Sequence, residues 1–165
     1  RHSFPTRRSS DLISGPEPQR TIFEQLLMQE LKTFSGSVAL VRGLPENAEN
    51  ESLVFDTESK ILIANHLSAD ELNKTIQQAD LVISRSGYTT IMDLIKLQQK
   101  AILIPTPGQT EQEYLAGYLM KKNIFLSVLQ KNFSLQKVAD FSFKKVCIKQ
   151  DEYKEVIKEF AQQLN

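Results

Sequence analysis

The sequence predicts an α/β fold with a mainly parallel sheet and helices on both faces, and three observations lead to this prediction. Short apolar runs alternate with stretches whose apolar residues recur at helical spacing, which is typical of repeated βαβ units. The runs at 81–84 and 101–104 are almost wholly apolar, as expected of strands that are covered on both faces. The 165 residues, 41% of them hydrophobic, suffice for one domain with a substantial core.

The order of the elements follows from the same patterns. Apolar runs predict the strands, in chain order 12–14, 37–41, 52–55, 61–64, 81–84, 101–104, 124–127 and 146–148. Helical spacing predicts the helices, in chain order 21–33, one that starts at Ser68, 89–97, 110–122, one near 134–140, and 151–164. Ser68 and Glu71 have the spacing of a capping box. Cys147 falls in a predicted strand and is expected to be a small buried residue.

Three strand-to-helix junctions are rich in Gly, Ser, Thr and Pro, at residues 14–21, 84–90 and 105–112. Ligands of open α/β sheets bind at the carboxyl ends of the strands, so we expect all three junctions at one edge of the sheet. Each junction opens a helix, whose free N–H groups and dipole favour phosphate. The sequence therefore predicts a diphosphate site. It contains neither GxGxxG nor GxxxxGK[ST], which disfavours the usual dinucleotide fold and a P-loop.

Several polar residues near these junctions have two interpretations each. Asp93 can accept hydrogen bonds from ribose hydroxyls, or it can close a capping box with Thr90. Arg85 can bridge a phosphate, or it can pair with a nearby acid. His66 can stack on a base, or it can lie in a loop with no specific role. The polar cluster at 109–113 can bind sugar hydroxyls, or it can be a solvated helix start.

Composition excludes several classes of protein. Lys and Arg together number 20, and so do Asp and Glu, which argues against a nucleic-acid partner. One cysteine and two histidines argue against a disulfide framework and against a zinc site. No apolar run approaches the roughly 18 residues of a membrane span. We expect a protein of the reducing cytoplasm.

Residues 1–11 differ from the rest of the chain because they are basic, rich in Ser and Arg, and without periodicity. A targeting arm is one interpretation. The alternative is that residues 3–11 are similar to a common sequencing adapter translated in frame. We expect residues 1–11 to be non-native and residues 12–165 to form the domain.

Residues 79–120 carry a recognisable pattern. Residues 80–87 read DLVISRSG, Asp93 and Leu94 follow, and residues 104–112 read IPTPGQTEQ. The pattern resembles the C-terminal, donor-binding domain of the family 28 glycosyltransferases, over roughly residues 12–130. The resemblance implies a Rossmann-like sheet that forms the C-terminal half of a GT-B fold, with the N-terminal acceptor domain missing from this chain.

The resemblance also implies donor-binding residues. Ser86 and Gly87 would face the diphosphate, Asp93 the ribose, His66 and Leu67 the uracil, and Gln112 the sugar. Four places depart from the family pattern: Asp93 replaces a Glu, Glu111 replaces a His, Ala116 replaces an Asn, and Ser14 with Gly15 replaces a Gly-Gly-Ser. The full set of expected donor-binding residues is Ser14, Gly15, His66, Leu67, Arg85, Ser86, Gly87, Tyr88, Thr89, Asp93, Gln109, Thr110, Glu111 and Gln112.

The activity that the resemblance implies is an inverting transfer of a hexosyl group, of the GlcNAc type, from a UDP-sugar to an acceptor, lipid-linked or glycan. It implies neither a metal nor a cofactor, and the catalytic base would lie in the missing half, so the fragment alone is expected to be inactive. That half would also make any peripheral contact with the inner face of the cell membrane. Two alternatives remain: a UDP-GlcNAc 2-epimerase-like GT-B protein, and a non-catalytic α/β module that binds a nucleotide or a protein.

Overall fold

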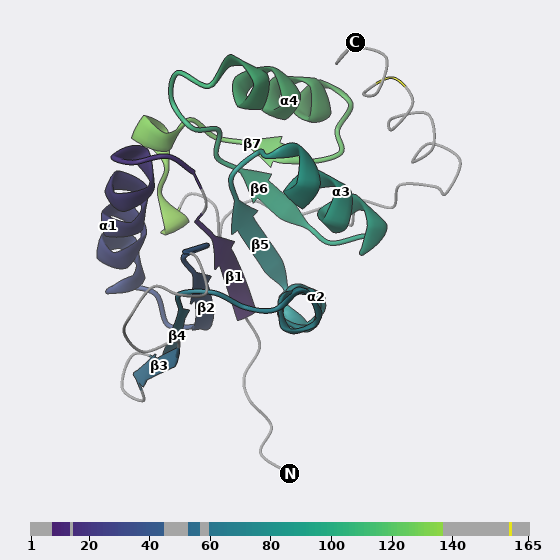
Figure 1. The fold of residues 1–165 in the computed structure, drawn as a ribbon. Coiled ribbons are helices and arrows are strands. Elements are labelled where there is room, and N and C mark those ends of the chain that lie inside the picture. Colours follow the sequence, from purple (N-terminus) through teal and green to yellow (C-terminus); the bar gives the residue numbers. More distant parts are fainter. Residues whose placement is uncertain (1–7, 14, 45–52, 57–59, 137–158, 160–165) are drawn as a thin grey trace.

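The computed structural model describes residues 8–13, 15–44, 53–56, 60–136 and 159. These residues form a sheet with helices on both of its faces (Figure 1). In chain order, the elements are β1 (Arg8–Leu12), α1 (Gln19–Leu31), β2 (Ser37–Val41), β3 (Leu53–Asp56), β4 (Ile61–Ala64), α2 (Ala69–Gln78), β5 (Leu81–Ser84), α3 (Tyr88–Lys96), β6 (Ala101–Leu103), α4 (Thr110–Lys121), β7 (Leu126–Ser127) and the 3₁₀ helix η1 (Gln130–Asn132).

The strands lie in the order β3-β4-β2-β1-β5-β6-β7. All neighbouring pairs are parallel except β3 and β4, which pair antiparallel. This arrangement confirms the predicted, mainly parallel α/β sheet. The strand order also reverses at β1, between β2 and β5, and such a switch point is where open α/β sheets bind ligands.

Two apolar clusters cover the two faces of the sheet, because successive side chains of a strand point to opposite faces. Val82 packs into a cluster with α2, α3 and α4, whereas Ile83 packs into the cluster of α1 and the segment after η1. Leu103 and Ile102 divide between the same two clusters. Figure 1 shows α1 across the sheet from α3, as this division requires.

Most predicted elements are confirmed within one or two residues. Ser68 caps α2, and its Oγ and backbone N–H both bond to the Glu71 carboxylate, which confirms the predicted capping box. The alternative capping box of Thr90 and Asp93 is wrong, because α3 already begins at Tyr88. The predicted strand at 146–148, Cys147, most of the helix near 134–140 and all but Glu159 of the helix at 151–164 lie outside the described residues.

The first strand differs from the prediction. It runs over Arg8–Leu12 rather than 12–14, so it extends into the segment that we expect to be non-native. Its backbone pairs with β2 on one side and with β5 on the other. The sequence RSSDL has no apolar run that marks a strand, so only the pairing with both neighbours reveals it.

Candidate functional site

The carboxyl ends of β1, β5 and β6 meet at one edge of the sheet, because the three strands are parallel neighbours. Each strand leads into the N-terminus of a helix, namely α1, α3 and α4. This confirms that the three polar junctions share one edge. Ser14, in the first junction, lies outside the described residues.

Direct contacts join the three junctions. Ser86 is fully buried, and its Oγ donates to the Gln112 carbonyl at 2.8 Å, which ties the second junction to the third. Gly15 lies against Thr106: a Cβ at Gly15 would stand 3.6 Å from the Thr106 hydroxyl. There is room for a side chain at this distance, but the φ of Gly15 is +137°, which residues other than glycine rarely adopt, so the backbone conformation favours glycine here.

Arg85 lies beneath these junctions rather than at their surface, because it is only 2% exposed. Its guanidinium donates to the carbonyls of Gln19 (3.0 Å), Ile104 (3.3 Å) and Pro105 (3.4 Å), and it stacks 4.2 Å from the centre of the Phe23 ring. Burial lowers its pKa to about 10. Among the described residues the partners of Arg85 are therefore three carbonyls and a ring, and the expected pairing with an acid is not seen there. The expected bridge to a phosphate stays a prediction.

The three helix starts differ in how open they are to an anion. The first residue before α3 is Gly87, which supplies no side-chain cap, and the first turn of α3 carries no acidic residue. A Cβ at Gly87 would meet nothing within 4 Å, so the space in front of this helix start is open. The start of α3, with the positive end of its dipole, thus faces an accessible position that suits a phosphate.

The start of α4 is occupied by its own side chains. The Gln112 Oε1 accepts from the Thr106 N–H at 3.0 Å, and a Glu113 oxygen accepts from the Gly108 N–H at 3.2 Å. The Gln112 amide also bonds to Gln109. Glu111 and Thr110 are exposed. These four expected residues, 109–112, lie together at one helix start, where their amide and carboxylate groups can meet sugar hydroxyls.

A cavity of about 250 Å³ opens beside the first turn of α3. Three of the expected residues line it: His66, Leu67 and Asp93. Thr90 stands one helical turn before Asp93, on the same side of the cavity. Apolar side chains line much of the rest, which suits a flat organic ring with a polar sugar at its rim. The other lining residues are Ile13, Val41, Gly43, Leu72 and Ile76.

Five expected residues of the second junction lie outside this lining: Arg85, Ser86, Gly87, Tyr88 and Thr89. Tyr88 is half-buried and packs against the apolar cluster of α2, α3 and α4, so much of its ring serves the core. Thr89 is exposed in the first turn of α3. Its position beside the open helix start leaves its hydroxyl accessible from solvent.

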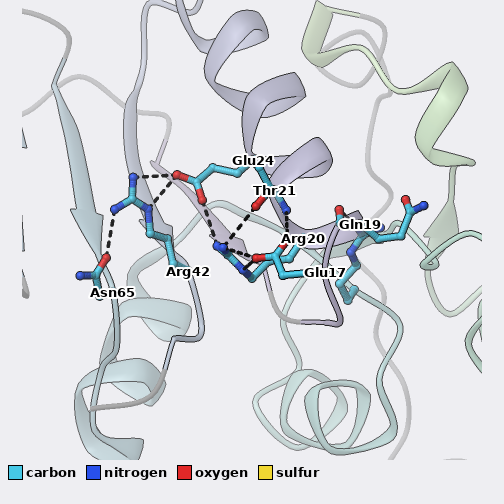
Figure 2. Close-up of polar contacts among 8 residues, drawn as sticks. Glu17, Gln19, Arg20, Thr21, Glu24, Arg42 and Asn65 are labelled. Atoms are coloured by element: carbon cyan, nitrogen blue, oxygen red, sulfur yellow. Dashed lines mark hydrogen bonds and ion pairs between the residues drawn. The ribbon is translucent and has the colours of Figure 1, made fainter. Parts of the chain in front are cut away.

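A chain of charged contacts joins α1 to the segments that follow β2 and β4 (Figure 2). Glu24 of α1 accepts from Arg42 at 2.7 Å and from Arg20 at 3.2 Å. Arg20 also pairs with Glu17, whose pKa is lowered by hydrogen bonds from Thr21 and Arg20. No local pattern in the sequence indicates these contacts, because Glu24 lies in α1 and Arg42, 18 residues later, lies just after β2.

The residues that the structure describes contain no group of three or more His, Cys, Asp or Glu side chains that could hold a metal ion. No helix among them is both long enough and apolar enough to cross a bilayer.

Comparison with known proteins supplies the context. The Glycosyltransferase family 28 C-terminal domain matches residues 28–164. The UDP-N-acetylglucosamine–N-acetylmuramyl-(pentapeptide) pyrophosphoryl-undecaprenol N-acetylglucosamine transferase of Rickettsia massiliae is 31% identical over 120 residues, which cover 70% of this chain and 31% of the relative. The transferase of the same name from a Bradyrhizobium species is 30% identical over 142 residues, covering 81% of this chain and 34% of the relative. The chain spans about a third of the length of these relatives.

Solved structures share the fold at low sequence identity. MurG of Acinetobacter baumannii superposes with a TM-score of 0.62 at 14% identity, covering 95% of this chain and 50% of that chain. The solution structure of ALG13 gives a TM-score of 0.57 at 14% identity, covering 87% of this chain and 88% of that chain. These likenesses confirm the predicted Rossmann-like half of a GT-B fold.

Proposed function

The chain belongs to the Glycosyltransferase family 28 C-terminal domain family, and from this premise we propose that it binds the donor of an inverting glycosyltransferase. The donor is a UDP-sugar, and a hexosyl group of the GlcNAc type is transferred to an acceptor. One observation carries the proposal: the cavity lies beside the open start of α3, and Thr90 and Asp93 of that helix line it. A nucleoside diphosphate needs this combination of an apolar recess, a carboxylate and an anion site.

Each part of the donor has a place in the proposed complex. The uracil enters the cavity beside His66 and Leu67, and the Asp93 carboxylate accepts hydrogen bonds from the ribose hydroxyls. The diphosphate lies at the start of α3, in front of Gly87. The sugar extends toward the start of α4, where Gln112 stands.

The proposed reaction breaks the bond between the anomeric carbon and a diphosphate oxygen while an acceptor hydroxyl attacks the opposite face of that carbon. The bonding electron pair leaves with UDP, so negative charge grows on the diphosphate. The dipole and N–H groups of α3 stabilise that charge without having to reorganise. We assign no residue of this chain the role of general base, since the family resemblance places the base in the acceptor half.

The curated relatives are named for an undecaprenol-linked acceptor. We therefore propose a lipid-linked acceptor for the whole protein, bound at the inner face of the cell membrane. In this proposal the chain described here supplies the donor site, and the additional length that the relatives possess supplies the acceptor site and the membrane contact.

Replacing Asp93 by Asn tests the ribose contact. Charged hydrogen bonds contribute about 1.5–3 kcal/mol each, so the Kd for UDP should rise roughly 10- to 100-fold. Isothermal titration with UDP and 2′-deoxy-UDP is the measurement. The wild-type chain should prefer UDP, and the Asp93→Asn variant should lose that preference.

The matched control is Asp70→Asn, because Asp70 is an exposed carboxylate on α2 that does not line the cavity. It should leave UDP binding unchanged. UDP that binds no better than GDP and dTDP would contradict the proposal. A folded chain that responds to no nucleotide would favour a protein-binding module instead.

A further inference from the structure

Two residues that line the cavity directly follow two members of the charged chain. Gly43 follows Arg42 at the end of β2, and His66 follows Asn65 at the end of β4. The position of this wall of the cavity is therefore tied to the positions of Arg42 and Asn65.

Arg42 and Asn65 are joined by both backbone and side chain. The Arg42 N–H donates to the Ala64 carbonyl at 2.8 Å, and the Leu44 N–H donates to the Asn65 carbonyl at 2.8 Å. The Arg42 Nη1 donates to the Asn65 Oδ1 at 3.0 Å, and Asn65 is only 8% exposed. The two strand ends thus form one unit.

Glu24 anchors this unit to α1. Its Oε1 accepts from both Nε and Nη2 of Arg42, each at 2.7 Å, and its Oε2 accepts from Arg20 at 3.2 Å. The Glu24 and Arg20 side chains are 16% and 15% exposed, so solvent screens their interaction less than it screens a surface pair. Arg20 in turn pairs with Glu17 in the loop after β1. Figure 2 shows the two arginines on either side of the Glu24 carboxylate.

We infer that Glu24 is a positioning residue for the donor site: through Arg42 and Asn65 it holds the loop of His66 and Leu67 against the cavity, and through Arg20 it holds the loop of Glu17. This inference rests on the proposed function, since it concerns the wall that would cover the base. Glu24 touches no ligand in this arrangement. It acts by fixing two loops to one carboxylate, which lowers the cost of ordering them when a nucleotide binds.

The test uses the whole chain with the variants Glu24→Gln and Arg42→Gln. Glu24→Gln keeps the size of the side chain, and Arg42→Gln shortens it. Each variant removes the ion pair between Glu24 and Arg42. Each variant should raise the Kd for UDP about tenfold. Because mutations within one hydrogen-bond network have non-additive effects on free energy, the double variant should have nearly the same Kd as either single variant. Arg42→Lys keeps the charge but not the forked geometry and should show an intermediate Kd.

Glu30→Gln is the matched control. Glu30 is also a carboxylate of α1 that ties down a distant segment, because its Oε2 accepts from the Leu135 N–H at 2.8 Å and from the Ser134 hydroxyl at 3.1 Å. That segment does not line the cavity. Glu30→Gln can destabilise the chain, yet it should leave the Kd for UDP unchanged.

Hydrogen exchange provides a readout that needs no nucleotide. In Glu24→Gln, the amides of Arg42 and Leu44 should exchange faster, because their acceptors, the carbonyls of Ala64 and Asn65, lie where β4 leads into the released loop. The amide of Leu135 should stay protected. In Glu30→Gln, the amide of Leu135 should exchange faster, while the amides of Arg42 and Leu44 stay protected. Unchanged exchange at Arg42 and Leu44, or faster exchange with an unchanged Kd for UDP, would overturn the positioning role. A wild-type chain that binds no UDP would instead overturn the proposed function and, with it, the role of Glu24 in donor binding.

Discussion

The helices α1 and α3 begin at the same edge of the sheet, but their first turns are chemically opposite. At α1 a carboxylate is already present, because Glu17 accepts from the Thr21 N–H at 3.3 Å and pairs with Arg20. At α3 the residue before the helix is Gly87, with no side chain and open space in front of it.

The difference teaches which helix start is available to a ligand. Both helices begin with the positive end of a helix dipole and with N–H groups that have no partner within the helix. The first satisfies them from within the chain, and its acidic group would repel a diphosphate. The second leaves them open beside the cavity. A shared position in the fold therefore does not imply a shared role, and the side chains of the junction decide the role.

Arg85 connects the two helix starts, so its removal should have the largest effect. Replacing it by Met leaves the carbonyls of Gln19, Ile104 and Pro105 without this donor in a buried position. A buried polar group that loses its partner costs about 1–3 kcal/mol, and we expect a total loss of about 3 kcal/mol in the free energy of unfolding. Urea denaturation followed by circular dichroism measures it.

Arg85→Lys separates charge from geometry at the same position. Lysine keeps a cation but cannot donate in three directions from one planar group or stack on Phe23 in the same way. The free energy of unfolding of Arg85→Lys should lie between those of the wild-type chain and Arg85→Met. Equal stability of all three proteins would mean that the guanidinium contacts contribute nothing to the junction.

Replacing Gly87 by Asp should convert the start of α3 into a copy of the start of α1. The backbone at Gly87 has φ −70° and ψ 143°, which suits an Asp cap, and a Cβ there meets nothing within 4 Å. The carboxylate would occupy the N–H groups and repel the diphosphate. We expect the Kd for UDP to rise about 30-fold, equivalent to about 2 kcal/mol, while the melting temperature of the free chain stays the same or rises.

Gly87→Asn is the neutral counterpart, since Asn caps a helix about as well as Asp does. It should weaken UDP binding only several-fold, by competition for the N–H groups without repulsion. Undiminished UDP binding by Gly87→Asp would place the diphosphate away from α3.

The neighbouring strands β1 and β5 show what the sequence can and cannot predict. The run LVIS predicts β5 to the residue, because apolar side chains mark a strand covered on both faces. The sequence RSSDL of β1 carries no such mark, although β1 lies between β2 and β5. The local sequence pattern thus predicts a strand whose side chains are apolar, whereas β1 follows only from its pairing with β2 and β5, which lie far away in the sequence.

The same division holds for the site. The family resemblance implies His66, Leu67 and Asp93, and the structure brings all three to one cavity. The pairing of Glu24 with Arg42 had no local signal, because it joins a helix to a strand end. The contacts of Arg85 also had no local signal, because its guanidinium meets Gln19 of α1, which lies 66 residues earlier in the sequence.

The smallest effect is expected from opening the start of α1 with Glu17→Gln. The pKa of Glu17 is lowered from its ordinary value of 4.5, chiefly by hydrogen bonding to Thr21 and then to Arg20. A depressed carboxyl pKa stabilises the folded chain above pH 4.5, and this stabilisation is lost as the pH falls through the lower, folded value. The melting temperature of Glu17→Gln should therefore lie slightly below that of the wild-type chain at pH 7, and the difference should disappear as the pH falls through the lowered pKa of Glu17.

UDP binding by Glu17→Gln then tests whether the diphosphate contacts the start of α3 alone or the start of α1 as well. If the diphosphate lies only at α3, the Kd for UDP should change by less than about twofold, because an exposed charge at a distance is largely screened. A clearly tighter Kd would mean that the Glu17 carboxylate competes with the diphosphate for the N–H groups of α1. Both helix starts would then contact the diphosphate. In that case Glu17 would weaken UDP binding, in addition to accepting hydrogen bonds at the start of α1.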